Sequence, residues 1–234
     1  KQEKQAGRHV TIGLLGCLAE REGASLLARQ PEIDVLCGPG ELDRLPMLLD
    51  NAMKGDLVDW HDRAAVQGNR SRRSATLSAA EDSLESLDLA RAFDPDQGGS
   101  HGRSAYVRIT RGCNKFCTYC VVPNTRGAEV HRPPDTIVDE CRALAEQGVI
   151  EITLLGQTVN HYMYVHGAAV GADGRERPQI GPGLTAFGKK DRGVAGQRVT
   201  TFADLLRRIH EEVSDIRRLR FVTSYPRDFG DDIL

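Results

Sequence analysis

The sequence has no run of apolar residues long enough to span a bilayer, which takes about 20 consecutive residues in a helix. It also has no charged and then apolar leader that ends at a cleavage site. Six cysteines among 234 residues do not form the dense pattern of a small secreted protein held by disulfides. These absences lead us to expect a cytoplasmic protein without a membrane anchor, in which closely spaced thiols bind metal.

Net charge is nearly absent as well, because 31 lysines and arginines oppose 33 acidic residues and leave −2. This balance excludes no class of partner, since a nucleic-acid site needs only a local basic patch. The length allows one large domain or two small ones. The sequence starts at Lys1 and stops at 231–234, where its pattern indicates the beginning of a helix. We therefore expect a fragment of a longer polypeptide.

Three thiols within eight residues are the most informative feature of the sequence. Cys113, Cys117 and Cys120 have the spacing Cys-x3-Cys-x2-Cys, and they directly follow a strand-like run at 106–110. No fourth cysteine is in register, whereas a structural zinc site is closed by four ligands and a bacterial ferredoxin motif has different spacing. Three thiolates on a short loop suit a four-iron cluster with one iron left open to a ligand.

The residues around these cysteines resemble a known family. The similarity is to the methylthiotransferases among the radical S-adenosylmethionine (SAM) enzymes. It extends over residues 112–120, with Tyr119 before the last cysteine, and over the continuation Val-Val-Pro-Asn-Thr-Arg-Gly-Ala-Glu at 121–129. The resemblance implies a [4Fe-4S] cluster on the three cysteines that binds SAM and cleaves it to a deoxyadenosyl radical, with the Tyr119 backbone beside SAM. The alternatives are a zinc loop completed by His131 or Cys141, or reduced thiols without metal.

Residues 1–54 alternate predicted strands and helices, which is typical of a parallel α/β sheet. Strands are expected at 9–16 and 33–37, a helix at 20–30 before Pro31, and another at 41–50. The resemblance identifies this region as part of an amino-terminal methylthiotransferase domain.

Gly-Cys-Leu-Ala-Glu-Arg at 16–21 resembles the last cysteine motif of that domain. The resemblance implies that Cys17 is one ligand of a second, auxiliary [4Fe-4S] cluster that supplies sulfur, and that its other cysteine ligands precede Lys1. The alternative is a buried thiol at a strand end, because free cysteine packs as a small hydrophobe. Cys37 matches no ligand of the family, and we expect it to pack in the core.

Residues 55–102 lose periodicity and are predicted to be an interdomain linker. Residues 103–234 are predicted to be an incomplete radical-SAM domain, the first part of a (β/α) partial TIM barrel. Strands are expected at 106–110, 151–155 and 220–222, and helices from Pro133 to Gly148 and from Thr201 to Val213. Three strands cannot close a barrel. Residues 165–200 are glycine-rich and without an apolar face, which indicates a mobile insertion at the rim of the site.

Gly156 and Gln157 follow the second expected strand at its carboxyl end, where barrel enzymes have their active sites. The family carries Leu-Gly-Gln-Asn-Val-Asn at this place, which implies that Gly156 and Gln157 border the methionine end of SAM. Thr158 departs from the family's asparagine and leaves the role of that position in doubt. The alternative is an ordinary strand-to-helix turn.

Basic residues are concentrated around the cysteines. Six of them oppose a single acid, Glu129, between 103 and 132: Arg103, Arg108, Arg111, Lys115, Arg126 and Arg132. A positive rim would favour the approach of an RNA backbone. Arg108 and Arg111 could equally serve the electrostatics of a cluster or pair with acids elsewhere.

The resemblance, rather than the charge, implies the substrate. It points to the tRNA-modifying branch, which adds a methylthio group to C2 of N(6)-dimethylallyladenosine next to the anticodon, with the anticodon stem-loop as partner and a flavodoxin- or ferredoxin-type electron donor. We expect a monomer. The rivals are methylthiolation of threonylcarbamoyladenosine in tRNA or of a ribosomal-protein aspartate, and a non-enzymatic iron-sulfur or zinc protein. The chain alone is expected to be inactive, because the family also carries two earlier cluster cysteines, the rest of the barrel and a TRAM domain.

Overall fold

The computed structural model describes residues 10–54, 62–66, 103–181 and 196–233. These residues fold into two compact units. The first unit contains the described residues up to 66 together with 117–127, and the second contains 103–116 and 128–233. Within the described ranges, no helix is long and apolar enough to cross a membrane.

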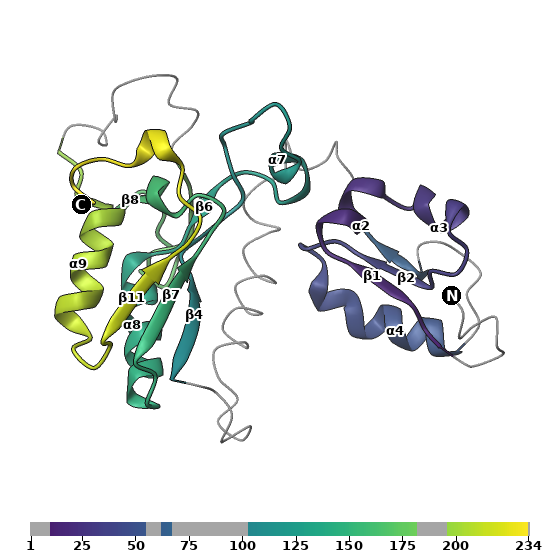
Figure 1. The fold of residues 1–234 in the computed structure, drawn as a ribbon, viewed down its shortest axis with the longest axis horizontal. Coiled ribbons are helices and arrows are strands. Elements are labelled where there is room, and N and C mark those ends of the chain that lie inside the picture. Colours follow the sequence, from purple (N-terminus) through teal and green to yellow (C-terminus); the bar gives the residue numbers. More distant parts are fainter. Residues whose placement is uncertain (1–9, 55–61, 67–102, 182–195, 234) are drawn as a thin grey trace. The chain divides into compact units, whose positions relative to one another are not determined.

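The first unit contains a parallel sheet in the order β1-β2-β3 (Figure 1). Its strands are β1 (Gly13–Leu15), β2 (Val35–Cys37) and β3 (Ala64–Ala65). Its helical elements are α2 (Cys17–Glu22), α3 (Ser25–Arg29), η1 (Leu42–Arg44), α4 (Leu45–Lys54) and α7 (Val122–Thr125). Small and branched apolar side chains are buried on both sides of the central strand, Leu36 with α2 and α3 and Val35 with α4. The expected parallel α/β alternation is therefore confirmed for this part of the chain.

Two details of the first unit differ from the sequence-based expectation. The single helix expected at 20–30 is two short helices, because Gly23 adopts a left-handed φ of 67° and ends α2. Strand β3 lies within 55–102, where we expected only a linker; its two alanines are small enough to be buried against α4 and α2. Residues 55–61 and 67–102 lie outside the described residues.

The second unit is built on a parallel sheet in the order β11-β7-β4. Its strands are β4 (Ser104–Arg108), β7 (Glu151–Leu155) and β11 (Arg218–Phe221). Tyr106, Thr153 and Arg220 are neighbours across the three strands. The three expected strands are confirmed, although β4 and β11 each begin two residues earlier than the apolar run indicated. Parallel strands joined by helices agree with the predicted front part of a radical-SAM barrel.

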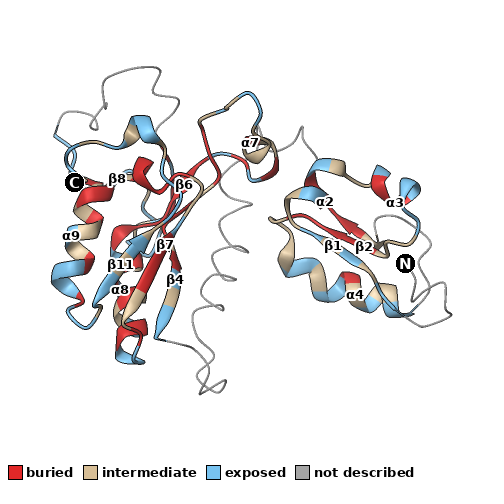
Figure 2. Ribbon diagram, viewed as in Figure 1, coloured by how far each residue is buried: buried red, intermediate tan, exposed pale blue. Residues whose placement is uncertain are grey.

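Helices α8 (Pro134–Glu146) and α9 (Phe202–Glu212) cover one face of this sheet (Figure 1). Burial is concentrated in β7 and on the sides of the two helices that face it (Figure 2). Cys141 lies on the buried stripe of α8. A capping box begins α9, since Thr201 Oγ1 accepts from Asp204 N and the Asp204 carboxylate accepts from Thr201 N.

Short strands surround the carboxyl ends of the main sheet. An antiparallel sheet joins β5 (Thr110–Arg111), β6 (Val130–His131) and β9 (Gln179–Ile180), and β8 (Met163–Val165) pairs with β10 (Val199–Thr201). The 3-10 turns η4 (Val159–His161) and η5 (Pro226–Asp228) follow β7 and β11. The described residues of the expected insertion at 165–200 are therefore partly regular, while 182–195 lie outside the described residues.

Candidate functional site

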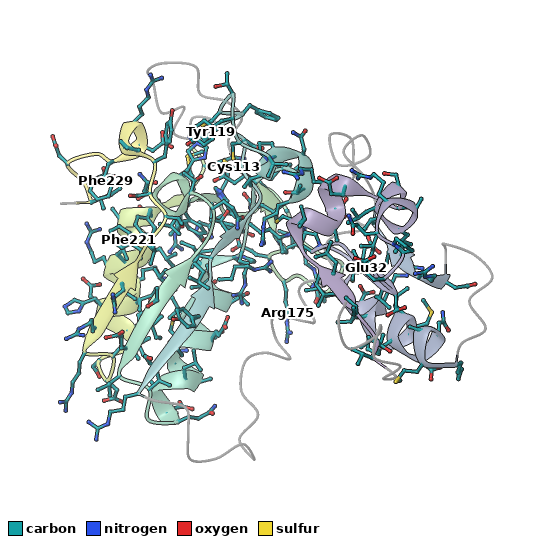
Figure 3. The ribbon with its side chains drawn as sticks, turned by 45° about the vertical axis from the view of Figure 1, so that its right-hand side comes forward. Glu32, Cys113, Tyr119, Arg175, Phe221 and Phe229 are labelled. Atoms are coloured by element: carbon teal, nitrogen blue, oxygen red, sulfur yellow. The ribbon has the colours of Figure 1, made fainter. Side chains whose placement is uncertain are left out.

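The first thiol of the cysteine loop is fixed by the turn that follows β7. Cys113 comes two residues after β5 and is buried. Its Sγ lies 3.4 Å from Thr158 Oγ1 and accepts a hydrogen bond from the Lys115 backbone N–H at 3.4 Å. Figure 3 shows the Cys113 side chain among those at the carboxyl ends of the strands of the second unit. Thr158, the position that departs from the family, therefore contacts the first cysteine directly.

The other two cysteines belong to the first unit. Cys117 and Cys120 are half-buried, and a turn joins them in which the Cys120 N–H donates to the Cys117 carbonyl at 2.9 Å. Helix α7 follows and packs against α2 within the same unit. Cys17 is the first residue of α2. The segment that carries two cysteines of the motif and the helix that starts at Cys17 are thus parts of one compact body.

The described residues contain no three His, Cys, Asp or Glu side chains that surround a common point suitable for a metal ion. The fit of a cluster rests on the chemistry of the donor set, because all three thiols of the motif are free and lie within eight residues. Soft thiolates are the donors that iron-sulfur clusters use. The three cysteines therefore suit an iron-sulfur cluster, and their roles as ligands stay predictions.

Gly156 stands where only glycine fits. A Cβ at this position would overlap Thr110 Cγ2 and lie 3.2 Å from Val159 Cγ1. The Gly156 carbonyl accepts a hydrogen bond from Thr223 Oγ1, and the Val159 N–H donates to the Thr223 carbonyl at 2.9 Å. The turn after β7 is thereby tied to the segment after β11, so the carboxyl ends of two neighbouring strands form one surface.

Gln157 carries a buried oxygen without a partner. Its Oε1 is inaccessible to solvent and makes no hydrogen bond among the described residues. A buried acceptor left unsatisfied costs about 1–3 kcal/mol, so such an atom needs a compensating role. A ligand with N–H groups would satisfy it, and the amino group of SAM is such a donor. The Gln157 oxygen thus fits the polar end of SAM.

One side chain joins the cysteine loop to a strand end, another joins two strand ends to each other, and sequence reasoning missed both links. Lys115 Nζ lies 2.5 Å from Asp228 Oδ2 and 5.1 Å from the ring centroid of Tyr225. Asn160 exchanges two hydrogen bonds with the Tyr225 backbone, each at 2.8 Å. The sequence offered one signal for the second link, because Asn160 and Tyr225 both follow the carboxyl ends of predicted strands.

Aromatic packing anchors the segment after β11. Phe221 meets Phe202 edge-on with ring centroids 5.1 Å apart, and its ring lies 6.2 Å from that of Phe229 (Figure 3). Such ring pairs add to the free energy gained from burial alone. Tyr225 and Asp228 are consequently held between fixed aromatic contacts.

Both residues that could have completed a zinc loop are engaged elsewhere. Both ring nitrogens of His131 have partners, Glu129 Oε1 at 2.8 Å and the Met163 backbone. Burial raises the pKa of the Cys141 thiol to about 12, which disfavours the thiolate a metal requires. Burial also raises the pKa of Cys37 to about 11, in agreement with core packing. The geometry therefore weighs against the zinc alternative.

The positive rim is smaller than the sequence count suggested. Arg132 Nη1 binds the Arg108 carbonyl at 2.7 Å and Glu140 at 2.7 Å, so this arginine is buried and structural. Lys115 is ion-paired as well. Arg126 remains exposed beside the motif, and the Tyr119 side chain is 92% exposed. Charge at the surface of this loop thus comes from fewer residues than expected.

Comparison with known proteins agrees with this geometry. The profile of the Radical SAM superfamily matches residues 107–233. The chain is 36% identical to the tRNA-2-methylthio-N(6)-dimethylallyladenosine synthase of Rhodopirellula baltica over 97% of its length and 40% of that protein. It is 38% identical to the synthase of the same name from Maricaulis maris over its whole length and 41% of that protein, and 35% identical to the one from Agrobacterium fabrum over its whole length and 41% of that protein.

The chain thus spans about two fifths of the length of these curated relatives. Their names agree with the resemblance found in the cysteine motif. The superfamily's cofactors are a [4Fe-4S] cluster and SAM. Because the family profile covers more than half of the sequence, from β4 through η5, this chain belongs to the Radical SAM superfamily.

Proposed function

We propose that the protein is a tRNA methylthiotransferase that adds a methylthio group to C2 of N(6)-dimethylallyladenosine next to the anticodon. The observation that carries this proposal is the combination of three free thiols within eight residues, which follow strands β4 and β5 along the chain, with relatives of that name along nearly the whole chain. C2 of adenine is an electron-poor carbon at which electrophilic substitution is difficult. A radical route suits that chemistry.

Cys113, Cys117 and Cys120 would hold the SAM-binding [4Fe-4S] cluster. When bound, such a cluster supplies the electron for the reductive cleavage of SAM. The chain's own residues orient the reactants: Thr158 and the Lys115 N–H contact the Cys113 sulfur. Hydrogen bonds with both neighbours limit the directions in which this sulfur can point.

Gly156 and Gln157 would receive the methionine end of SAM, together with the backbone at Tyr119. The missing Cβ of Gly156 lets its backbone pack directly against Thr110 and Val159, which fixes the turn that carries Gln157. The unpaired Gln157 Oε1 would accept a hydrogen bond from the amino group of SAM. The alternative of an ordinary strand-to-helix turn offers no partner for that oxygen.

Cys17 would be one ligand of the auxiliary cluster, within an amino-terminal methylthiotransferase domain. The packing of α7 on α2 supports this assignment, because both helices follow directly from proposed ligands within one unit. The remaining partners of the proposal are the tRNA anticodon stem-loop and a flavodoxin- or ferredoxin-type electron donor. The exposed Tyr119 and Arg126 offer a stacking surface and a charge for a single-stranded loop.

The proposal is tested with the full-length protein reconstituted anaerobically with iron and sulfide. We expect SAM cleavage, a change of the EPR spectrum on addition of SAM, and a methylthio product in tRNA that bears N(6)-dimethylallyladenosine, detected by mass spectrometry of nucleosides. Cys117→Ser should abolish all three, whereas Cys37→Ser, in a buried thiol of the core, should retain them.

Parallel reactions separate the rival functions. Threonylcarbamoyladenosine tRNA and the ribosomal-protein substrate are offered under the same conditions. Intact SAM cleavage with product only from one of these would overturn the substrate assignment. A metal site whose spectrum does not respond to SAM would instead favour the structural iron-sulfur or zinc protein.

A further inference from the structure

A carboxylate enclosed between two imidazoles lies beside the cysteine loop. The side chains of Glu129 and His131 are inaccessible to solvent, and His161 is 9% exposed. His131 Nε2 is 2.8 Å from Glu129 Oε1, and His161 Nδ1 is 2.9 Å from Glu129 Oε2 and 3.0 Å from Oε1. Because a carboxylate only accepts hydrogen bonds, both ring nitrogens that face it carry protons.

The carboxylate is ionised in this enclosure. Burial raises the pKa of Glu129, but the hydrogen bonds from His131 and His161 and the electrostatic attraction of these rings outweigh burial and lower the pKa to about 2. Its oxygens are thus occupied by N–H donors from two sides. Removing either donor would leave a buried charge with fewer partners, which is a costly change.

His131 is locked in place by its other contacts. Its Nδ1 faces both polar groups of the Met163 backbone, the carbonyl at 2.9 Å and the N–H at 3.1 Å. Its ring stacks on Tyr162 with centroids 5.2 Å apart. The Gly181 N–H donates to the Glu129 carbonyl at 2.8 Å, and a Cβ on Gly181 would lie 2.7 Å from His131 Nε2. No larger residue fits over the ring at this point.

The backbone of Glu129 connects this cluster to the cysteine loop. Its N–H donates to Asn114 Oδ1 at 3.1 Å, and Asn114 directly follows Cys113. On the other side, the His161 N–H donates to the Thr158 carbonyl at 3.2 Å, and Thr158 Oγ1 reaches the Cys113 sulfur. Two routes therefore lead from the buried carboxylate to the first cysteine, one through each neighbouring loop.

We propose that Glu129 is a positioning residue whose hydrogen bonds from His131 and His161 hold the Gly156–His161 turn against the base of the cysteine loop. The consequence of this positioning for SAM rests on the proposed function. The turn that carries Gly156 and Gln157 is held at the distance from Cys113 that SAM binding requires. Loss of the His161 donor loosens the turn and the Cys113–Lys115 segment together. Glu129, His131 and His161 act on the site through the segments that they hold together.

The test uses a pair of substitutions at His161 in the full-length protein. His161→Leu removes the donor, whereas His161→Asn places an amide N–H near the position of Nδ1. His166→Leu is the matched control, because His166 also pairs with a carboxylate, Glu176, at 3.1 Å, but contacts neither the cysteine loop nor the turn. Amide hydrogen exchange is measured in the cofactor-free protein at Lys115, Glu129 and His161.

We expect exchange at these amides to become about tenfold faster in His161→Leu and to stay within about threefold of wild type in His161→Asn. His166→Leu should leave the three amides unchanged. If His161→Leu does not fold, Glu129→Gln takes its place, with the same three amides expected to exchange faster. Unchanged exchange in the folded variant, or equal acceleration in His166→Leu, would overturn the proposal.

A second measurement determines how the substitutions change the affinity for SAM in the reconstituted protein. The dissociation constant of SAM, from the EPR change, should rise about tenfold in His161→Leu, while cleavage at saturating SAM stays within about threefold. An unchanged dissociation constant would contradict the consequence for SAM. If wild type itself shows no response to SAM, the proposed function is wrong, and the exchange measurement still decides whether Glu129 holds the two segments together.

Discussion

The hydroxyl of Thr158 lies 3.4 Å from the sulfur of Cys113, so a residue that departs from the family's motif contacts the first thiol of the cysteine loop. A hydroxyl that donates to a sulfur withdraws negative charge from it. In an iron-sulfur protein, hydrogen bonds to the sulfurs raise the reduction potential. With Cys113 as a ligand of the proposed cluster, Thr158 would be a residue that raises the reduction potential of that cluster.

Thr158→Val tests this contact because valine keeps the shape of threonine and removes the hydroxyl. We expect the reconstituted cluster to form and its reduction potential to fall by an amount on the order of tens of millivolts. An EPR-monitored redox titration measures the shift. Thr200→Val, which removes the partner of His166 Nε2 at 2.7 Å, is the control and should not change the potential.

Gly156→Ala tests the close packing at the end of β7. The added methyl group would overlap Thr110 Cγ2 and press on Val159, so we expect a loss of about 1–3 kcal/mol in the free energy of unfolding. Urea unfolding measures it. Gly13→Ala is the control, because a Cβ there meets its nearest atom at an ordinary 3.9 Å. Equal stability of Gly156→Ala and wild type would refute the steric requirement.

Gln157→Leu should change stability and ligand binding in opposite directions. Removal of the unpaired oxygen relieves a desolvation cost, so the cofactor-free protein is expected to be as stable as wild type or more stable by about 1 kcal/mol. Binding of SAM should weaken by at least about tenfold. Calorimetry of unfolding and SAM titration measure the two effects.

Gln179→Leu is the matched control for this experiment. The Gln179 amide has two hydrogen bonds to the Val165 backbone, at 3.1 Å and 2.5 Å, which the substitution removes. We therefore expect this variant to lose stability. A destabilised Gln157→Leu would show that its oxygen has a partner in the folded protein.

The pH dependence of the free energy of unfolding should reveal the lowered pKa of Glu129. Its folded pKa of about 2 lies below the ordinary value of 4.5, so the folded state binds this proton less readily than the unfolded state. The ionised carboxylate thus contributes stability that is complete above about pH 4.5 and is lost as the pH falls toward 2. The difference in unfolding free energy between wild type and Glu129→Gln should shrink over this interval.

Urea unfolding at several pH values between 3 and 7 measures that difference. Glu146→Gln, in an exposed carboxylate at the end of α8, serves as the control for the loss of one negative charge. A difference that stays constant from pH 7 to 3 would contradict the lowered pKa of Glu129.

Much of the fold was predictable because local patterns determine it. The apolar runs at 151–155 and around 106 indicated β7 and β4, and the stripe that includes Cys141 indicated α8. Thr201 and Asp204 stand three residues apart, which is the spacing of a capping box. Hydrophobic periodicity and capping depend on neighbours within a few residues, so a single sequence contains the signal.

The cluster around Glu129 was not predictable in this way. His161 lies 32 residues after Glu129, and His131 reaches the Met163 backbone over the same separation. Strand β9 comes from a glycine-rich segment that shows no strand periodicity. Gly181, which follows β9, lies over the His131 ring. Contacts of this kind depend on how short strands pair across the sheet, and polar residues at such separations give no local pattern.

Strand β11 pairs with β7 in register, with Arg218 directly opposite Glu151. Arg218 and Arg220 lie on the same face of the strand, and both reach the Glu151 carboxylate, at 2.9 Å and 3.1 Å. A slip of β11 by one residue against β7 would turn both arginines to the opposite face of the sheet. One carboxylate that receives two arginines thus also specifies how these two parallel strands align.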